Sequence, residues 1–467
     1  MKENELVFVS GNPGSTGRLN TMAQMEYLRD FAYPWTLKSL ASRIALLKNY
    51  AAKSEENARR AQEMIFGLEN AQKAYKGYNS GLLDQTLMGK KAAEEKQLQQ
   101  TVNADAKKKA EFGDPWTAIA DAMKVQKDIF LPLTYLERRN GFRGTLAGYA
   151  RTLVRATEEK TKPDADRLRE YRTSALPSLE QSLFAQEPLY KDLEELLLGD
   201  SMKEMNEQMP NNPLLKEILN GRTPEVAARE MIANTKLDDV NVRKELYNGG
   251  VKAVQASNDP LIKLMLTIDP EARKVRKQYD DQVDSVERAA GAKIAKLLFA
   301  QHGFDTAPDA TFTLRLSYGA VRGYVEDGRG SVAAKGEKVP YFTTMGGAFD
   351  HATKHGNKSP YDLPASWMNA KGKFNGNTAL NFASTPDIIG GNSGSPVINK
   401  NAEVVGIIFD GNIQSLPWRF QYEDVIGRAV SVDSRGIIEA LRNIYGAGAL
   451  ADELTGGKAA PAKAGAK

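Results

Sequence analysis

Residues 390–396 read Gly-Gly-Asn-Ser-Gly-Ser-Pro, and candidate strands flank them at 378–382 and 395–399. A serine hydroxyl attacks a carbonyl only if a sharp backbone turn exposes its Oγ atom. The N–H groups of that serine and of the residue two before it must also converge on the developing oxyanion. Ser393 and Gly391 occupy these two positions, and glycine adopts backbone angles forbidden to other residues. An ordinary Gly/Ser/Asn hairpin turn is the alternative. Six consecutive residues match the pattern around a nucleophilic serine, and a strand follows them. This favours a nucleophile loop, with Gly391 in the oxyanion hole.

In chymotrypsin-like serine peptidases, a histidine base and its orienting aspartate precede the nucleophile, on the first of two β-barrels. The chain has three histidines, His302, His351 and His355, and none lies in a candidate first barrel. His302 ends a helical pattern, where the helix dipole favours a histidine. His351 and His355 are spaced i,i+4 in a polar stretch without a third ligand, so we expect a solvated turn rather than a zinc site. We therefore expect no metal and no cofactor, and the nucleophile has no visible base.

The composition is that of an ordinary globular protein. Its 467 residues, 41% hydrophobic and 26% charged, are enough for two or three domains with sizeable cores. The 63 basic and 59 acidic residues nearly balance, at a net charge of +4, so charge does not favour a nucleic-acid partner or an anionic membrane surface. No apolar run approaches the ~18 residues of a membrane span. The absence of cysteine excludes disulfides, metal–thiolate sites and cysteine catalysis.

The sequence changes from helical to strand-like periodicity near Pro308. Apolar side chains recur at helical spacing from about residue 21 to 302, and prolines separate successive helices. After Pro308 the sequence predicts short strands at 312–318, 321–325, 341–344, 378–382, 395–399, 404–409 and 429–432. This is enough β-structure for one barrel and not for two.

We therefore expect an α+β multidomain fold in four parts. These are a residual strand and loop at 1–20, a large helical domain at 21–310, a β-barrel carrying the nucleophile at 311–446 and a disordered tail at 447–467. In this arrangement the strand at 5–10 is an orphan. The loop at 11–18 lacks the Gly-Lys-Ser/Thr of a phosphate-binding loop, so we expect a structural turn. The chain begins on a strand, with too short an apolar run for a signal peptide, which suggests missing upstream sequence.

A second feature is the carboxylate at the end of the apolar strand 404–412, which reads Val-Val-Gly-Ile-Ile-Phe-Asp-Gly-Asn. In chymotrypsin-like folds the strand that follows the nucleophile lines the S1 pocket and pairs with the substrate backbone. There, Asp410 could hold the free α-amino group of a peptide. Such a pair would fix the cleavage site at a set distance from the peptide's N-terminus, because an interior peptide segment offers no cation. An Asp-Gly turn that closes a hairpin is the alternative, and spacing alone leaves the two open.

Together, residues 390–396 and 404–412 resemble the bacterial dipeptidyl-peptidase seven and eleven family, serine exopeptidases that remove dipeptides from peptide N-termini. The likeness extends to residues 8–18, 313–319, 323–324 and 427–433, which are spread over nearly the whole chain. The resemblance implies a chymotrypsin-like double barrel with a large helical domain inserted between its halves. The C-terminal β-barrel would then be the second half, in agreement with the order of strand, helices and strands along the sequence.

The resemblance also implies roles for individual residues. The nucleophile falls on Ser393 and the amine-binding aspartate on Asp410. The segment 66–70, Phe-Gly-Leu-Glu-Asn, resembles the setting of an asparagine that also holds the substrate amine, which makes Asn70 the candidate; an exposed helical asparagine is the alternative. The next position separates specificities for P1, the residue before the scissile bond. An arginine there selects acidic P1 side chains, whereas this chain has Gly411, as in members that prefer hydrophobic P1 residues.

The implied function is that of a serine dipeptidyl-peptidase acting on oligopeptides with a free N-terminus. The resemblance implies a periplasmic or extracellular location and leaves a homodimer open. The family's histidine and aspartate lie upstream of anything present here, so the chain departs from the pattern by truncation, which puts its own activity in question. One alternative is a trypsin-like or glutamyl-type endopeptidase, in which Asp387 would lie at the base of S1 rather than order a turn. Another is an inactive peptide-binding fragment, in which Ser393 has no base.

Overall fold

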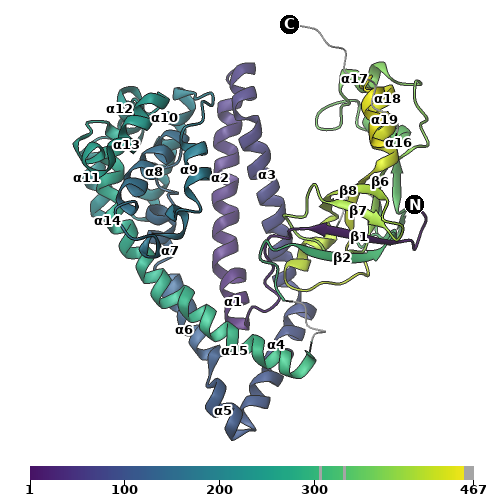
Figure 1. Cartoon of the computed structure of the whole chain (residues 1–467), viewed down its shortest axis with the longest axis horizontal. Coiled ribbons are helices and arrows are strands. Elements are labelled where there is room, and N and C mark those ends of the chain that lie inside the picture. Colours follow the sequence, from purple (N-terminus) through teal and green to yellow (C-terminus); the bar gives the residue numbers. More distant parts are fainter. Residues whose placement is uncertain (304–307, 330–332, 457–467) are drawn as a thin grey trace. The chain divides into compact units, whose positions relative to one another are not determined.

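The computed structural model describes residues 1–303, 308–329 and 333–456 (Figure 1). The chain forms two compact units, one made of Met1–Ala106 and Ala295–Lys467 and the other of Lys107–Ile294. The first unit holds both ends of the chain and every strand that the described residues form. The four-part division expected from the sequence stays a prediction.

The centre of the first unit is a seven-stranded antiparallel sheet. Its strands are β1 (Leu6–Gly11), β2 (Arg315–Ala320), β5 (Phe342–Thr344), β6 (Ala379–Ser384), β7 (Pro396–Asn399), β8 (Val404–Gly411) and β9 (Ala429–Asp433), while β3 (Tyr324–Val325) pairs separately with β4 (Lys338–Val339). The order in the sheet is β2-β1-β7-β8-β9-β6-β5. Because the two edge strands, β2 and β5, do not pair with each other, the sheet is open. The described residues therefore do not form the closed β-barrel that we expected over 311–446.

Strand β1 lies inside this sheet, so the expectation of an orphan strand at 5–10 is wrong. It pairs with β2 from Leu6↔Ala320 to Gly11↔Arg315, and with β7 along its other side. Its alternate residues Val7 and Val9 have no exposed surface. Figure 1 shows this purple strand among the green and yellow strands of the C-terminal part. The local pattern indicates a strand, but both of its neighbours come from the opposite end of the chain.

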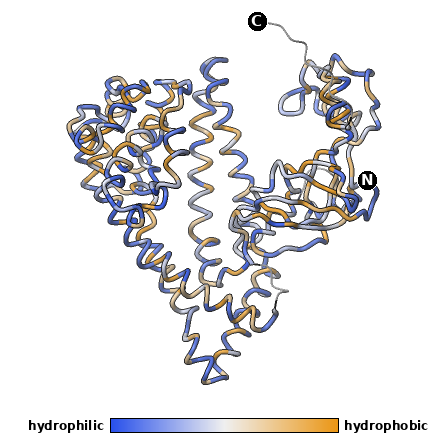
Figure 2. Tube along the Cα trace, in the orientation of Figure 1, coloured by the Kyte–Doolittle hydropathy of each residue, from blue (hydrophilic) through white to orange (hydrophobic). Residues whose placement is uncertain are grey.

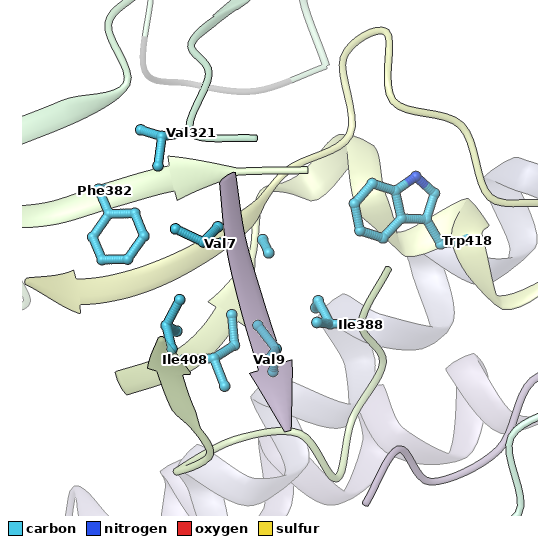
Figure 3. Close-up of a cluster of buried hydrophobic side chains, with 9 residues drawn as sticks. Val7, Val9, Val321, Phe382, Ile388, Ile408 and Trp418 are labelled. Atoms are coloured by element: carbon cyan, nitrogen blue, oxygen red, sulfur yellow. The ribbon is translucent and has the colours of Figure 1, made fainter. Parts of the chain in front are cut away.

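The apolar side chains of the sheet converge on one core. Its buried members are Val7, Val9, Val321, Phe382, Ile388, Val397, Ile408, Trp418 and Ala429. Figure 3 shows side chains from β1, β6 and β8 turned toward a common interior. The indole of Trp418 is fully buried and donates a hydrogen bond from Nε1 to the carbonyl of Glu423 (2.7 Å), so its one polar group is satisfied. Burial of each large apolar side chain contributes roughly 1.5–3 kcal/mol.

A long helical hairpin belongs to the same unit. Its helices are α1 (Met22–Tyr27), the π-helical turn η1 (Leu28–Ala32), α2 (Tyr33–Ala51), α3 (Glu55–Leu83) and α4 (Gln85–Asn103). Helices α2 and α3 lie side by side (Figure 1), and polar and apolar residues alternate along both (Figure 2). Ser54 is the N-cap of α3, and its hydroxyl accepts a hydrogen bond from the N–H of Asn57 (3.1 Å).

Helix α3 packs against η7 (Ile413–Arg419), the 3₁₀ segment that follows β8. A Cβ atom at Gly77 would lie 2.2 Å from Leu416 Cδ1, and one at Gly81 would lie 3.1 Å from Pro417 Cβ. The two glycines lie four residues apart and therefore share one face of the helix. Glycine at these positions lets the helix backbone approach η7 closely.

The second unit is helical. In sequence order, its helices are α5 (Ala106–Phe112), α6 (Pro115–Asp128), α7 (Phe130–Pro132), η2 (Leu133–Glu137), α8 (Thr145–Glu159), η3 (Asp164–Asp166), η4 (Arg169–Tyr171), α9 (Leu176–Leu183), α10 (Lys191–Gln208), α11 (Pro213–Leu219), α12 (Pro224–Asn234), α13 (Val240–Ala256), α14 (Pro260–Tyr279), η5 (Asp280–Asp284) and α15 (Ser285–His302), and Ala106 and the residues of α15 from Ala295 onward belong to the first unit. Buried Arg155 is paired with Glu137 through both terminal nitrogens (2.9 and 2.6 Å) and with Asp269 through Nε (2.5 Å). These carboxylates offset the cost of burying a guanidinium group. None of the described helices has both the length and the apolar character needed to span a bilayer.

The described residues of the C-terminal part form four α-helices: α16 (Met345–Lys354), α17 (Ala365–Asn369), α18 (Ser434–Asn443) and α19 (Gly448–Leu454). The expectation of a solvated turn around His351 is wrong, because Met345, Phe349 and Ala352 are buried at helical spacing and form the inner face of α16. Helix α19 lies inside the range for which we expected a disordered tail, and its Ala451 is buried. The remainder of that range, 457–467, lies outside the described residues.

The position of β1 generates a stability prediction. Val9→Ala removes apolar surface from a fully buried site between β2 and β7, and should lower the free energy of unfolding by about 1–3 kcal/mol. The matched control is Leu316→Ala on β2, because Leu316 is 63% exposed and its truncation should change stability by less than ~0.5 kcal/mol. Urea denaturation followed by circular dichroism measures both. An equal, small effect of the two changes would contradict the central place of β1.

Candidate active site

The loop that carries Ser393, the residue expected to be the nucleophile, lies between β6 and β7 and is held against the segment that follows β1. The N–H of Gly14 donates a hydrogen bond to the carbonyl of Gly390 (2.7 Å). Gly391 has a φ of +109°, and a Cβ atom there would lie 2.5 Å from the Asn12 carbonyl oxygen. Both the backbone angle and the close approach therefore require glycine at position 391.

The loop is also tied to β8. Buried Asn392 accepts a hydrogen bond from the N–H of Ile389 through Oδ1 (3.1 Å), which fixes the turn from inside. The N–H of Gly394 donates to the carbonyl of Ile408 (2.8 Å), and the N–H of Ile408 donates back to Ser395 (3.0 Å). In the part of the chain that the structure describes, the N–H groups of Gly391 and Ser393 have no protein acceptor. Two free donors at these positions are what an oxyanion hole needs.

The hydroxyl of Ser393 is exposed and donates to the carbonyl of Phe409 on β8 (3.2 Å). No histidine among residues 1–303, 308–329 and 333–456 hydrogen-bonds to it. His302 is the last residue of α15. His351 and His355 lie on and just after α16, where the ring of His355 stacks on Tyr361 with centroids 3.8 Å apart. No group of three metal-ligating side chains is present in the described residues.

Asp410 comes directly after Phe409, at a bulge in β8. The pairing of β8 with β9 shifts register between Ile408 and Asp410, so that Phe409 is the additional residue. A bulge bends the strand and re-aims its side chains, and here Phe409 and Asp410 are both exposed. One carboxylate oxygen of Asp410 accepts the N–H of Gly411 (2.8 Å).

Gly411 is enclosed on its Cβ side. A Cβ atom there would lie 2.3 Å from the hydroxyl oxygen of Ser415, which itself donates to the carbonyl of Asn412 (2.7 Å). A larger residue at 411 therefore needs Ser415 to move. This steric relation was not visible in the sequence.

Asn70 lies on α3, exposed, one helical turn before Lys73. The ammonium group of Lys73 donates to Asp410 Oδ2 (3.3 Å), so this helix reaches the end of β8. Asn70 lies seven residues before Gly77, and therefore on the helix face that packs against η7. The sequence analysis missed Lys73, although its i,i+3 spacing from Asn70 was a signal that the two share a face.

Asp387 forms a bidentate ion pair with Arg18, with oxygen–nitrogen distances of 2.5 and 2.7 Å. The Nε of Arg18 also donates to the carbonyl of Trp418 (3.0 Å), so the pair joins the loop after β1 to the nucleophile segment. Because Asp387 is already neutralised by an arginine, it does not offer the unpaired carboxylate that a trypsin-like S1 pocket needs. The loop at 11–18, expected to be a structural turn, is further fixed by Asp309, which accepts the N–H groups of Arg18 (2.8 Å) and Leu19 (3.0 Å).

A cavity of about 400 Å³ lies beside this ion pair. Its lining includes Arg18, Tyr318, Asp387, Ile389 and Tyr422. Burial raises the pKa of Tyr422 to about 12, and its hydroxyl donates to the carbonyl of Thr385 (2.6 Å). The phenol is therefore neutral at physiological pH and contributes an apolar ring with a satisfied hydroxyl.

A sequence profile of the family described as Peptidase S46 matches residues 1–456. The Asp/Glu-specific dipeptidyl-peptidase of Shewanella putrefaciens is 24% identical over 486 residues, which cover 97% of this chain and 65% of that protein. Dipeptidyl-peptidase 7 of Phocaeicola vulgatus is 37% identical over 158 residues, which cover 32% of this chain and 20% of that protein. The crystal structure of DPP11 of Porphyromonas endodontalis in complex with the dipeptide Arg-Glu matches with a TM-score of 0.74 and 19% identity, over 97% of this chain and 65% of that chain.

The solved structure shows likeness of fold, and the profile shows family membership. The chain spans 65% of the length of the Shewanella relative. The nucleophile loop, β1 and the strand that ends at Asp410 all lie within the residues that the profile matches. On this match, the chain belongs to the peptidase S46 family.

Proposed function

We propose that Ser393 is the nucleophile of a serine dipeptidyl-peptidase and that Asp410 binds the α-ammonium group of its peptide substrate. The observation that carries this proposal is the hydrogen bond from Ser393 Oγ to the carbonyl of Phe409, the residue immediately before Asp410. Nucleophile and carboxylate are thus adjacent at the end of β8. Two extended residues span at most about 7 Å. When the N-terminal amine of a peptide is held at Asp410, a peptide bond close to that N-terminus, rather than one further along the peptide, therefore reaches Ser393.

In the proposed reaction, Ser393 Oγ forms a bond to the scissile carbonyl carbon, and the N–H groups of Gly391 and Ser393 stabilise the oxyanion. The C–N bond then breaks, the leaving amine takes the proton that the Ser393 hydroxyl gave up, and water hydrolyses the acyl-enzyme, which releases the dipeptide and restores the hydroxyl. Loss of one oxyanion donor typically costs 10²–10³-fold in rate. Asn70 is a proposed second contact to the amine, supported by its place on the α3 face that packs against η7.

We further propose a hydrophobic P1 preference. Gly411 brings no cation, so a buried acidic P1 side chain at that position would be unpaired, at a cost of several kcal/mol. An apolar side chain would gain roughly 1.5–3 kcal/mol on burial. The exposed apolar residues Ile407 and Phe409 on β8 support this preference. The Shewanella relative is named Asp/Glu-specific, which makes acidic P1 residues the alternative to test.

A dipeptidyl-peptidase and an endopeptidase differ in whether the substrate must have a free α-amino group. An endopeptidase accepts substrates with a blocked N-terminus, and the pairing of Asp387 with Arg18 does not favour a trypsin-like pocket. An inactive peptide-binding protein would bind peptides without turnover. A periplasmic or extracellular location and a homodimer stay predictions.

The 467-residue chain by itself should turn over slowly. Ser393 has no histidine partner in the described residues, and loss of the triad's base costs on the order of 10⁴- to 10⁶-fold. Release of p-nitroaniline from Leu-Phe-p-nitroanilide measures turnover, with Ser393→Ala as the control. Rapid turnover that Ser393→Ala abolishes would contradict this expectation, and His351 and His355 would then be the first candidates for the base.

The amine anchor is tested by Asp410→Asn in the protein as its source organism makes it. Loss of a charge-assisted hydrogen bond should lower kcat/KM for a free-amine dipeptidyl substrate about 10- to 150-fold. Asn70→Ala removes a neutral partner and should cost about 2- to 12-fold. Asp350→Asn, at an exposed site on α16, is the matched control and should have no effect. Cleavage of an N-acetylated substrate as fast as the free-amine form would instead support the endopeptidase.

Position 411 is tested with a panel of dipeptidyl substrates that differ only at P1. The parent enzyme should prefer Leu or Phe over Glu. Gly411→Arg should shift this preference toward Asp and Glu, most clearly when combined with Ser415→Ala, which removes the hydroxyl that a Cβ atom at 411 would meet at 2.3 Å. Ser415→Ala alone is the matched control and should keep the parental preference. Faster cleavage of P1 Glu by the parent enzyme would overturn the hydrophobic assignment.

A further inference from the structure

Asp410 already has a cationic partner in this structure. Lys73 Nζ lies 3.3 Å from Asp410 Oδ2, and the two side chains are 49% and 50% exposed. The other carboxylate oxygen accepts the N–H of Gly411. Within the described residues, Lys73 is the one side-chain cation that forms an ion pair with Asp410.

The backbone positions of helix α3 and of strand β8 bring Lys73 and Asp410 together. Gly77 and Gly81 lie four and eight residues after Lys73, and they hold that face of α3 against Leu416 and Pro417 of η7. The bulge at Phe409 turns Asp410 toward solvent at the end of β8. The lysine is therefore presented to the carboxylate by two fixed elements rather than by a chance surface encounter.

The pair is weak enough to exchange. Its distance of 3.3 Å exceeds the roughly 2.7–2.9 Å of strong charge-assisted hydrogen bonds, and its half-exposed groups are screened by water. The lysine ammonium and the α-ammonium of a peptide offer the same chemistry, a compact cation with three donors. A carboxylate that accepts one group accepts the other.

We propose that Lys73 is the resident counter-ion of Asp410, and that a peptide's α-ammonium group binds by displacing it. This inference rests on the proposed role of Asp410 as the amine anchor. Only the fraction of Asp410 that is not paired with Lys73 is open to the amine, so the lysine weakens the apparent affinity for free-amine peptides. The product dipeptide keeps its α-ammonium group, and the return of Lys73 to Asp410 therefore favours product release.

The inference predicts a gain of affinity on removal of the lysine. Binding is measured by NMR titration of the 467-residue chain carrying Ser393→Ala, with the dipeptide Leu-Phe and its N-acetyl form as probes. Lys73→Met should lower the Kd for Leu-Phe by about 1.4- to 5-fold, the range that an exposed ion pair supplies. Lys73→Arg keeps a counter-ion and should give no gain. Lys76→Met, at an exposed lysine of the same helix, is the matched control and should leave the Kd unchanged.

The N-acetyl dipeptide has no ammonium group to exchange, so Lys73→Met should not improve its binding. Circular dichroism verifies that each variant is folded. Equal or weaker binding of Leu-Phe by Lys73→Met overturns the inference, and so does failure of both the parent and this variant to bind. Asp410→Asn separates the two proposals, because unchanged binding of Leu-Phe by that variant contradicts the amine anchor itself.

Discussion

The insertion of β1 between β2 and β7 is the constraint on which the first unit depends. Its backbone hydrogen bonds join the start of the chain to two strands from the C-terminal part, and its Val7 and Val9 complete the core of the sheet. Without this strand, β2 would lose its only partner in the sheet order of the described residues. The chain thus leaves the sheet after β1, forms the helices, and returns to the same sheet at β2.

The geometry of the nucleophile loop follows from that insertion. The segment after β1 is bonded to the loop, because the N–H of Gly14 donates to the Gly390 carbonyl and Arg18 pairs with Asp387. On its other side the loop is bonded to β8. The turn at Gly391 and Ser393 is therefore held by two elements from opposite ends of the chain. Such support keeps the backbone donors of a site in place before a ligand arrives, which is what electrostatic stabilisation of an oxyanion requires.

The amine end of the site depends on a different contact. Glycines on α3 let the helix approach η7, and the bulge in β8 turns Asp410 outward toward Lys73. The proposed site thus combines one rigid part, the nucleophile loop, with one exchangeable part, an exposed ion pair. This division suits the proposed exopeptidase activity, in which Ser393 would have to be pre-positioned while the amine of each peptide enters and leaves.

Local patterns in the sequence were sufficient for the turn at 390–394, the helical run to His302 and most strands of the C-terminal part, because turn chemistry and side-chain periodicity act over a few residues. They also predicted a strand at 5–10, but not its place in the sheet. The open sheet, the Arg18–Asp387 pair and the Lys73–Asp410 pair were decided only by the tertiary structure. The two ion pairs join residues 369 and 337 positions apart, and no short-range pattern encodes which distant partners a folded chain brings together.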